Sequence, residues 1–576
     1  MAGFGFRFRG AFLVACAVSL AFCAVSLAAP PPLRIVYFIP SDREALADRV
    51  ERIDRTMTDV QTFYRDGMAA AGYGPMSFGL ERDGEGRLIL HEVRGRHPMA
   101  AYGRNDAGKV REEVKAALAA RGMDIDREVA VIFQLLLKWE DGRAVEVGPY
   151  VGGGDGRYGT AWVYDDERLD AARLGSKEPG GYYGRACSIG QFNSHYVGGV
   201  AHELGHALGL PHDCETREER ARLGRSLMGG GNHTYGQERR GEGRGSFLSG
   251  VSAMLLRYGR PFAGEVAAAD QRAVSELEGL DARFAEGVLT LTGRVSGEPP
   301  VWGLAAYDDL ASIPGDYDAV GWTCKVEADG RFRLAVGELR PGRSQLRIRT
   351  CHVNGRTATH AFDYTVDAAG VPDTGVFVYT GPLQQAVQAY LARERQKTEA
   401  LARELARRFA DVEPVRRKAG HLLALLEPAP PQPLAGVAPD VRRVGVSGLA
   451  FAEASVGWGR VSRDQVPERV FLQVGGVFYE SGLYAHAPSR FALDLGGGWR
   501  RFRAGYGLQD QMGGSVVFVV RGDGKELFRS AQVKDSQVRE MDADVSGVGR
   551  LELVVEDAGD GNRADWGVWL APQLER

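Results

Sequence analysis

The sequence is poor in histidine and cysteine, with 11 and six among 576 residues, and it carries almost no net charge. A formal charge of −4 at pH 7 gives no basic field to attract nucleic acid or acidic lipid, so nucleic acid is not expected as a partner. Beyond the first 30 residues, no stretch is apolar for long enough to span a bilayer. With 44% hydrophobic and 25% charged residues, the composition is that of a globular protein with three or four domains.

Residues 1–28 have the features of a secretory signal peptide. Two arginines precede an apolar run over residues 11–27, and small residues end it so that cleavage would follow Ala28. A membrane anchor is the alternative, but the run is short and Pro30 follows almost at once. Cys23 would suit a lipoprotein, except that a bulky phenylalanine precedes it. We therefore expect a secreted protein, extracellular or periplasmic, with no integral membrane segment after cleavage.

Four cysteines lie outside that segment: Cys187, Cys214, Cys324 and Cys351. An even number in an oxidising compartment suggests two disulfides, which could form with three connectivities. Proximity in the sequence favours Cys187 with Cys214 and Cys324 with Cys351. The alternative is a set of buried free thiols.

Residues 33–280 alternate between strand and helix patterns, which predicts one α/β domain. Glycine-rich loops flank the last predicted strand, which is a possible edge strand, and a third helix is expected to begin near residue 194. The predicted strands span residues 33–39, 88–93, 129–137 and 160–164, and the first two helices span residues 42–71 and 109–121.

In the rest of the chain, the spacing at which apolar residues recur changes several times. Over residues 286–378 apolar residues alternate with period two, which predicts an Ig-like β-sandwich. This segment shows no catalytic constellation, so we expect it to be a spacer. Apolar residues recur at helical spacing over residues 383–427, and a proline-rich linker over residues 428–437 leads to a β-rich domain over residues 438–576.

The strongest motif is the run His202-Glu-Leu-Gly-His206-Ala-Leu-Gly209-Leu-Pro-His212. His202 and His206 are four residues apart, so they share one face of a helix and can reach one metal ion. Gly209 can take the left-handed conformation that ends a helix, which lets His212 approach from a third direction. Three neutral imidazoles with one open position are typical of a catalytic zinc site. Glu203 is out of phase with these ligands, so it can face a water without binding the metal.

This arrangement predicts hydrolysis of an amide bond. A zinc ion there would activate water and polarise the scissile carbonyl, while Glu203 would act as the general base and pass the proton to the leaving amine. In a chain with so few histidines, the motif has a chance probability on the order of one in ten thousand. We predict a zinc endopeptidase acting on proteins or glycoproteins. The alternatives are a noncatalytic carbohydrate-binding adhesin with a relic zinc site and a zinc amidase acting on peptidoglycan.

The spacing His-Glu-x-x-His-x-x-Gly-x-x-His-Asp resembles the signature of the metzincin clan of zinc peptidases. The resemblance implies a twisted sheet, an active-site helix and a methionine turn below the metal. It also implies an edge strand above the cleft that pairs with extended substrate, for which residues 160–164 are the candidate. Residues 226–231, Ser-Leu-Met-Gly-Gly-Gly, fit that turn with Met228 as its methionine. Some members have a tyrosine two residues further on, but this chain has Gly230. Asp213 resembles a structural acidic residue found in one branch of the clan.

The histidines outside the motif are not spaced along the chain as metal ligands usually are. His233 and Tyr235 follow the methionine turn, and they either line the cleft or are ordinary loop residues. The rest are expected to be packed or on the surface, namely His91, His97, His195, His352, His360 and His421.

Short strand and turn motifs lie at residues 482–489, 493–495, 502–507, 514–520, 523–525 and 565–566. In type, order and spacing they resemble the NPCBM family over residues 438–576, and the name of that family implies carbohydrate binding. The resemblance implies a β-sandwich. Aromatic side chains stack on sugar rings, so Tyr484, Trp566 and Trp569 are candidate glycan-binding residues, with core packing as the alternative. His486 is expected to organise its loop.

The expected fold is therefore multidomain α+β. A metzincin-like α/β domain that binds Zn²⁺ is followed by a β-sandwich, a helical segment and a C-terminal β-sandwich.

Overall fold

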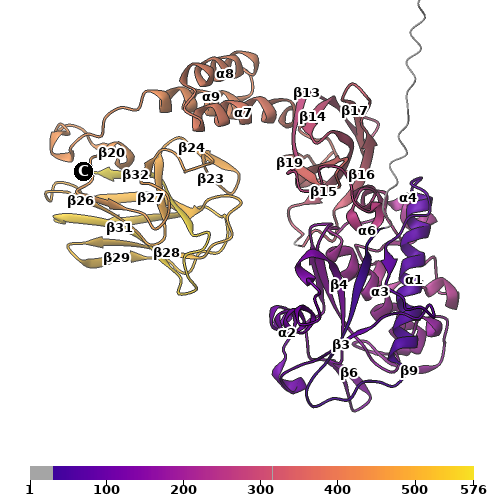
Figure 1. Cartoon of the computed structure of the whole chain (residues 1–576). Helices are drawn as coiled ribbons and strands as arrows, with labels where there is room; N and C mark the ends of the chain where they lie inside the picture. The colour runs from indigo at the N-terminus through magenta and orange to yellow at the C-terminus, as the bar shows by residue number, and fades with distance from the viewer. Residues whose placement is uncertain (1–29, 314) are drawn as a thin grey trace, which may run out of the picture. The chain divides into compact units, whose positions relative to one another are not determined.

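The computed structural model describes residues 30–313 and 315–576, which form two compact units divided after Asp373 (Figure 1). The chain contains both helices and many β-sheets, so the expected multidomain α+β organisation is confirmed. The expected signal peptide and its cleavage point lie outside the described residues. Within the described part of the chain, every helix is too short or too polar to cross a bilayer.

A twisted sheet forms the centre of the first domain, with the strand order β2-β1-β4-β8-β7 and with β3 also paired to β1. All pairs on this path are parallel except β8 with β7, which is antiparallel. The strands are β1 (Pro32–Ile39), β2 (Gly79–Leu80), β3 (His91–Arg94), β4 (Val129–Gln134), β7 (Val151–Gly154) and β8 (Gly159–Tyr164).

The prediction that residues 160–164 form the edge strand is wrong. These residues belong to β8, which pairs with β4 on one side and with β7 on the other. β7 is the edge strand, and three of its four residues are glycine. Such a segment carries no alternation of apolar and polar side chains, so hydrophobic periodicity cannot detect it.

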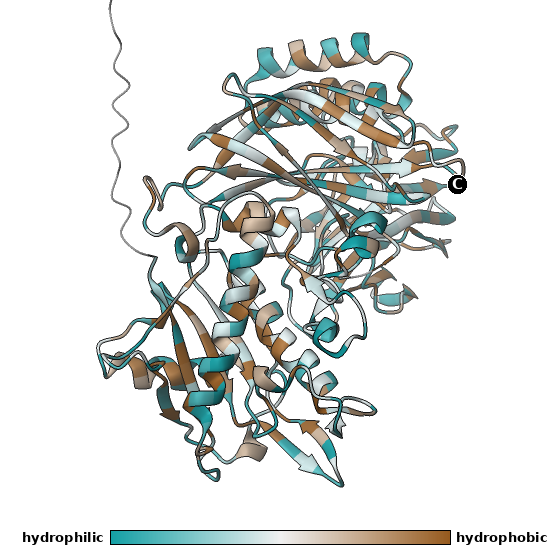
Figure 2. Cartoon of the chain, turned by 90° about the vertical axis from the view of Figure 1, so that its right-hand side faces the viewer, coloured by the Kyte–Doolittle hydropathy of each residue, from teal (hydrophilic) through white to brown (hydrophobic). Residues whose placement is uncertain are grey.

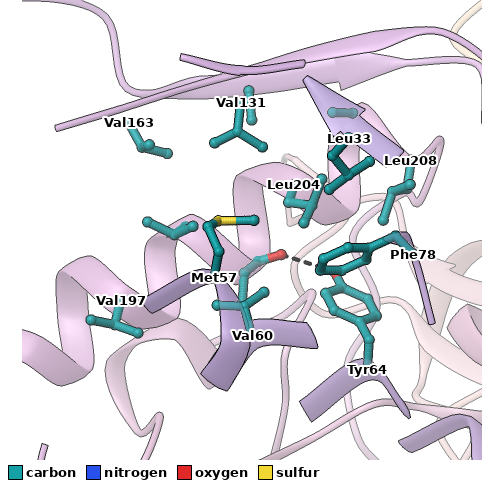
Figure 3. Close-up of a cluster of buried hydrophobic side chains, with 14 of the residues drawn as sticks. Leu33, Met57, Val60, Tyr64, Phe78, Val131, Val163, Val197, Leu204 and Leu208 are labelled. Atoms are coloured by element: carbon teal, nitrogen blue, oxygen red, sulfur yellow. Dashed lines mark hydrogen bonds between the residues drawn. The ribbon is translucent and has the colours of Figure 1, made fainter. Parts of the chain in front are cut away.

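Helices cover both faces of this sheet. α1 (Arg49–Ala70) and α3 (Ile189–Ala207) pack on one face, and α2 (Ala107–Ala119) packs on the other. Because the central strands are buried on both faces, they are apolar along their length, as their brown colour in Figure 2 shows. The core between the sheet, α1 and α3 includes Leu33, Val131, Val163, Met57, Val60, Val197 and Leu204 (Figure 3).

Short elements complete the domain around these layers. The expected helices are found, although α1 and α2 begin at Arg49 and Ala107, and α3 begins at Ile189 rather than near residue 194. The smaller elements are β5 (Leu137–Glu140), β6 (Arg143–Glu146), β9 (Pro179–Tyr182), β10 (Ala186–Ser188), α4 (Arg217–Arg222), β11 (Arg225–Ser226), β12 (Ser246–Phe247), α5 (Gly250–Leu256) and α6 (Arg260–Ala263).

Two further sheets of the first unit, with the orders β13-β14-β17 and β16-β15-β18-β19, form what we call the β-domain. β15 and β16 pack against α5 through a buried apolar cluster that includes Met254, Tyr307 and Ala319. The β-domain therefore belongs to the same compact unit as the α/β domain. Its strands are β13 (Val274–Ala285), β14 (Val288–Glu298), β15 (Val301–Leu310), β16 (Val320–Lys325), β17 (Arg331–Val336), β18 (Gly342–His352) and β19 (Thr357–Val366).

The expected disulfides are absent, since all four described cysteines are free thiols. Cys324 on β16 and Cys351 on β18 lie on opposite sides of β15, so two strand spacings of about 4.8 Å separate them. A disulfide needs Cα atoms within about 7 Å. Cys187 precedes α3 and Cys214 follows it, and a 19-residue helix is roughly 28 Å long. Proximity in the sequence was misleading in both pairs because a regular element lies between the partners.

The second unit begins with three helices that share one apolar core, α7 (Gly375–Leu391), α8 (Arg395–Arg408) and α9 (Glu413–Leu426). A β-sandwich follows, as expected, with one sheet in the order β22-β25-β32-β27-β30 and the other in the order β21-β26-β31-β28-β29. Its main strands are β25 (Gly482–His486), β26 (Ser489–Asp494), β27 (Arg501–Leu508), β28 (Val516–Gly522), β29 (Lys525–Arg529), β30 (Arg539–Asp544), β31 (Arg550–Asp557) and β32 (Trp566–Glu575). The short strands are β20 (Arg443–Gly445), β21 (Glu453–Ser455), β22 (Ser462–Arg463), β23 (Leu472–Val474) and β24 (Val477–Tyr479).

Candidate metal centre and cleft

Helix α3 places the first two histidines of the motif. It begins with a capping box, in which the Ser188 side chain accepts from the Gln191 amide and the Gln191 side chain accepts from the Ser188 amide. The helix ends just before Gly209, whose φ of 86° lies in the left-handed region. A Cβ atom at Gly209 would lie 2.7 Å from the Gly156 amide nitrogen, so only glycine allows this turn. Beyond it, the chain reverses and brings His212 back toward the helix.

The three histidines meet as the spacing predicts, and we call His202, His206 and His212 the histidine triad. The Nε2 atom of His206 lies 3.2 Å from that of His202 and 3.1 Å from that of His212. All three ligand atoms lie within 4.8 Å of one another.

The other ring nitrogen of each triad histidine faces a backbone carbonyl. Each Nδ1 atom donates to one oxygen, at 2.8 Å to Leu227, 2.9 Å to Leu210 and 2.8 Å to Gly315. With the proton held on Nδ1, every Nε2 presents a lone pair to the same point. Burial lowers the pKa of His202 to about 3 and also lowers that of His206, so both rings are neutral, the form that binds a metal.

These residues fit a zinc ion. Zn–N bonds of about 2.0–2.1 Å in a tetrahedral site place the nitrogen atoms about 3.3 Å apart, close to the two separations of 3.2 and 3.1 Å from His206 to the other histidines. Three lone pairs directed at one point repel each other, and a cation between them would remove that repulsion. Among the described residues, the set contains no thiolate and no fourth side chain, which is the composition of a site with an open position.

We expect removal of a bound metal to lower the melting temperature. Because a ligand that binds only the folded state stabilises it, zinc at a hundredfold excess over Kd adds roughly 3 kcal/mol. The measurement is a thermal melt of the chain before and after dialysis against a chelator, and again after adding Zn²⁺ or Mg²⁺. Zinc should restore the melting temperature and magnesium should not, since imidazole suits zinc and magnesium prefers oxygen ligands. A melting temperature that ignores the chelator would count against the site.

Glu203 lies half-buried beside the triad. Burial raises the pKa of this carboxyl to about 7, and the Gly152 amide acts in the opposite direction by favouring the charged form. A cation held by the triad would also favour the carboxylate. The group is thus placed to accept a proton near neutral pH.

The edge strand β7 rests directly on the backbone of α3. A Cβ atom at Gly152 would lie 1.9 Å from the Glu203 carbonyl oxygen, and one at Gly154 would lie 2.1 Å from that of Ala207. Gly153, between them, has open space at its Cβ position. Among the described residues, β7 has β8 as its one strand partner. Its outer edge, close to Glu203, therefore has backbone groups that an extended chain could pair with.

Two buried residues support the centre from below. Met228 lies in van der Waals contact with α3, where a Cβ atom at Gly205 would be 2.4 Å from its sulfur. The buried carboxylate of Asp213 accepts hydrogen bonds from Ser249 at 2.6 Å, from Ser252 at 2.7 Å and from Ser226. These contacts fix the chain immediately after His212 and give Asp213 no access to the cleft.

The sequence left open whether His233 and Tyr235 line the cleft or are ordinary loop residues. Nδ1 of His233 lies 3.2 Å from Nδ1 of His195, and the Tyr183 ring stacks on His195 with ring centroids 3.4 Å apart. His195 is buried, as expected for a packed residue. Tyr235 is buried and donates to Asp59 at 2.8 Å, so it does not line the cleft.

Sequence reasoning missed a contribution from the β-domain. The Tyr317 ring stacks on the His212 ring with centroids 3.7 Å apart, and Gly315 accepts the hydrogen bond of His212. Both residues follow β15, more than 100 residues after the motif. No local pattern marks them, because their importance arises only when the two domains pack.

In the second unit, the three candidate aromatic residues are packed inside. Tyr484 and Trp569 are fully buried and Trp566 is nearly so. Burial excludes Tyr484 and Trp569 from stacking on a sugar, so core packing is their role. Trp458, which the sequence did not single out, is 44% exposed, and its ring centroid lies 5.2 Å from that of Trp566 and 6.1 Å from that of His486.

Comparison with known families identifies the C-terminal domain. Residues 442–575 match the family described as NPCBM/NEW2 domain, which confirms the resemblance found in the sequence. A protein of Renibacterium salmoninarum named "Putative endo-alpha-N-acetylgalactosaminidase" is 32% identical over 124 residues. That match covers 20% of this chain and 8% of the relative, so the chain spans less than a tenth of that protein's length.

Solved structures similar to this chain include OgpA from Akkermansia muciniphila. The wild-type protein is 24% identical with a TM-score of 0.51, and the match covers 59% of this chain and 95% of OgpA. A catalytically inactive OgpA in complex with an O-glycopeptide (glycodrosocin) substrate is 23% identical, also with a TM-score of 0.51. The second unit is little more than a third of this chain, so the shared fold must include part of the first unit.

Proposed function

We propose that this chain is a secreted zinc endopeptidase that cleaves peptide bonds in glycoproteins. One observation carries the proposal: three histidine Nε2 atoms converge beside Glu203, next to a glycine-rich edge strand whose outer side has no strand partner among the described residues. This arrangement combines a metal site, a base and a surface for an extended peptide in one place.

The residues of the chain divide the work of amide hydrolysis among them. The histidine triad would hold the zinc ion, which when bound would act as a Lewis acid that polarises the scissile carbonyl and activates water. Glu203 takes a proton from the attacking water and returns it to the leaving amine. β7 offers backbone amides and carbonyls to the substrate backbone, which holds the scissile bond over Glu203.

Several features support a metzincin-like assignment for the α/β domain. An antiparallel edge strand lies next to the helix that carries His202 and His206, Gly209 turns the chain toward His212, and Met228 lies buried beneath the helix. These are the parts that the resemblance to the clan implies.

The comparisons support a glycosylated substrate. OgpA, which shares the fold, has been crystallised with an O-glycopeptide substrate. The second unit carries a domain of a family named for carbohydrate binding. A glycan-binding domain on the same chain as a peptidase would raise the local concentration of glycoprotein substrate.

The decisive experiment compares three substrates. The mature protein is incubated with a mucin-type O-glycoprotein, with the same protein after enzymatic removal of its glycans, and with peptidoglycan, each with and without a chelator. We expect chelator-sensitive cleavage of the glycoprotein backbone that zinc restores. Cleavage of peptidoglycan alone would favour the amidase, and glycan binding without any cleavage would favour the adhesin.

For the second unit, we expect Trp458→Ala to weaken glycan binding by roughly tenfold, a loss of about 1.4 kcal/mol. Trp458 is the most exposed large aromatic residue of the C-terminal domain, and an exposed ring can stack on a sugar face. The measurement is calorimetric titration with mucin-type oligosaccharides. Val477→Ala, an exposed substitution on β24, is the matched control and should leave binding unchanged. Equal affinity for both variants would remove Trp458 from the binding surface.

A further inference from the structure

We propose that residues 315–319 of the β-domain, which we call the β-domain loop, are a structural part of the metal centre. In this role the loop positions His212, the third ligand, and so the β-domain does more than act as a spacer. The inference rests on the proposed function in one respect, namely that the histidine triad binds zinc.

His212 has the weakest local support of the triad. His202 and His206 project from α3, a regular helix whose backbone hydrogen bonds fix their Cα positions. His212 lies beyond the end of that helix, in a segment without regular structure, and is half-buried. A ligand on such a segment loses more conformational freedom on binding a metal, unless another part of the protein already orders it.

The β-domain loop supplies that order through two contacts of different kinds. The Gly315 carbonyl accepts a hydrogen bond from His212 Nδ1 at 2.8 Å, which leaves the Nε2 lone pair free for the metal. The Tyr317 ring stacks on the His212 ring with centroids 3.7 Å apart and planes inclined by 26°. The hydrogen bond fixes the tautomer, and the stacking restricts the tilt of the ring.

The backbone of the loop is shaped to make both contacts at once. Gly315 and Asp316 have φ angles of 88° and 60°, so two successive residues lie in the left-handed region. For Asp316, which carries a Cβ atom, this conformation is sterically unfavourable, and contacts elsewhere must offset it. The turn brings the Gly315 carbonyl and the Tyr317 ring to the same imidazole.

The loop is anchored on both sides. Asp316 accepts from the Arg347 guanidinium of β18 at 2.6 Å, and Asp318 forms an ion pair with Arg340. On the other side, the amide of Cys214, which lies two residues after His212, donates to the Ala319 carbonyl at 2.6 Å. The loop is thus tied to the sheet of the β-domain and to the segment that carries the third ligand.

Tyr317 remains accessible to solvent while it packs on the third ligand. Tyr317 is 53% exposed although its ring stacks on His212. A group in this place can order the third ligand without occupying the open position of the metal.

Zinc affinity of the full chain tests the proposal. Zn²⁺ is titrated in competition with a chromogenic chelator into the wild type, Tyr317→Phe and Tyr317→Ala. Loss of a group that orients a ligand weakens metal binding by about 10–100-fold, so we expect a loss of roughly tenfold or more in Tyr317→Ala. Tyr317→Phe keeps the stacked ring, so its affinity should stay within about twofold of the wild type.

A second variant keeps the test independent of folding problems at position 317. Arg347→Met removes the anchor of Asp316 without touching the triad, and its zinc affinity should fall in the same direction while its thermal unfolding stays cooperative. Wild-type affinity in both Tyr317→Ala and Arg347→Met would overturn the proposal. Because no substrate is used, failure to cleave glycoproteins leaves this result standing, whereas a wild type that binds no zinc overturns both proposals.

Discussion

Glu203→Gln should lower the kcat/KM for peptide-bond cleavage by about 10²–10⁴-fold, the usual contribution of a positioned general base. The substitution keeps the size and the hydrogen-bonding capacity of the side chain but removes its ability to take a proton. Zinc content and melting temperature should stay at wild-type values, because Glu203 is not a member of the triad and its burial is not changed. The measurement is the rate of glycoprotein cleavage together with the zinc content of the purified variant.

A matched control separates this effect from a general loss of charge. Glu218 lies exposed on α4, close to the motif in sequence, and Glu218→Gln should leave the rate unchanged. Full activity in Glu203→Gln would exclude it as the base, and loss of zinc in that variant would make the rate uninformative about proton transfer and contradict the predicted retention of metal.

Gly152→Ala should impair both stability and activity. Its Cβ atom would lie 1.9 Å from the Glu203 carbonyl oxygen, and neither partner is a flexible side chain that can move aside. Relief requires β7 and α3 to separate, at a cost of roughly 3 kcal/mol or more. A shift of about 1 Å between the edge strand and the base can reduce the rate by about 100-fold. Thermal melts and cleavage rates measure the two effects.

Gly153→Ala is the control for this prediction, since it lies in the same strand and has no described atom within 4 Å of the added methyl group. We expect its melting temperature and activity to match the wild type. If Gly152→Ala, like Gly153→Ala, keeps the melting temperature and activity of the wild type, the close contact between β7 and α3 is not needed for function.

The second prediction depends on the small distance between the edge strand β7 and helix α3, the helix that also carries Glu203. Glycine at positions 152 and 154 lets the backbones approach to a separation that no other residue allows. An extended substrate on the outer edge of β7 would therefore lie close to Glu203 and to the triad. The same closeness explains why a glycine-rich strand, a poor strand by propensity, occupies this edge.

The sequence determined the centre of the site but not its surroundings. The spacing of His202, Glu203 and His206 is converted into geometry by the pitch of one helix, and Gly209 ends that helix because of its own conformational freedom. Such relations are local, so the order of the residues along the chain is enough to predict them. The NPCBM motifs were recognisable for a similar reason, since their strands and turns follow each other in a fixed order.

Only the tertiary structure decided which distant segments meet. Residues 160–164 became an inner strand because β7 pairs outside them, and the cysteines stayed free because β15 and α3 separate the partners. Tyr317 reached His212 across more than 100 residues, through the packing of β15 and β16 on α5. Contacts of this kind depend on how whole elements pack, and no periodicity within a single segment encodes that packing.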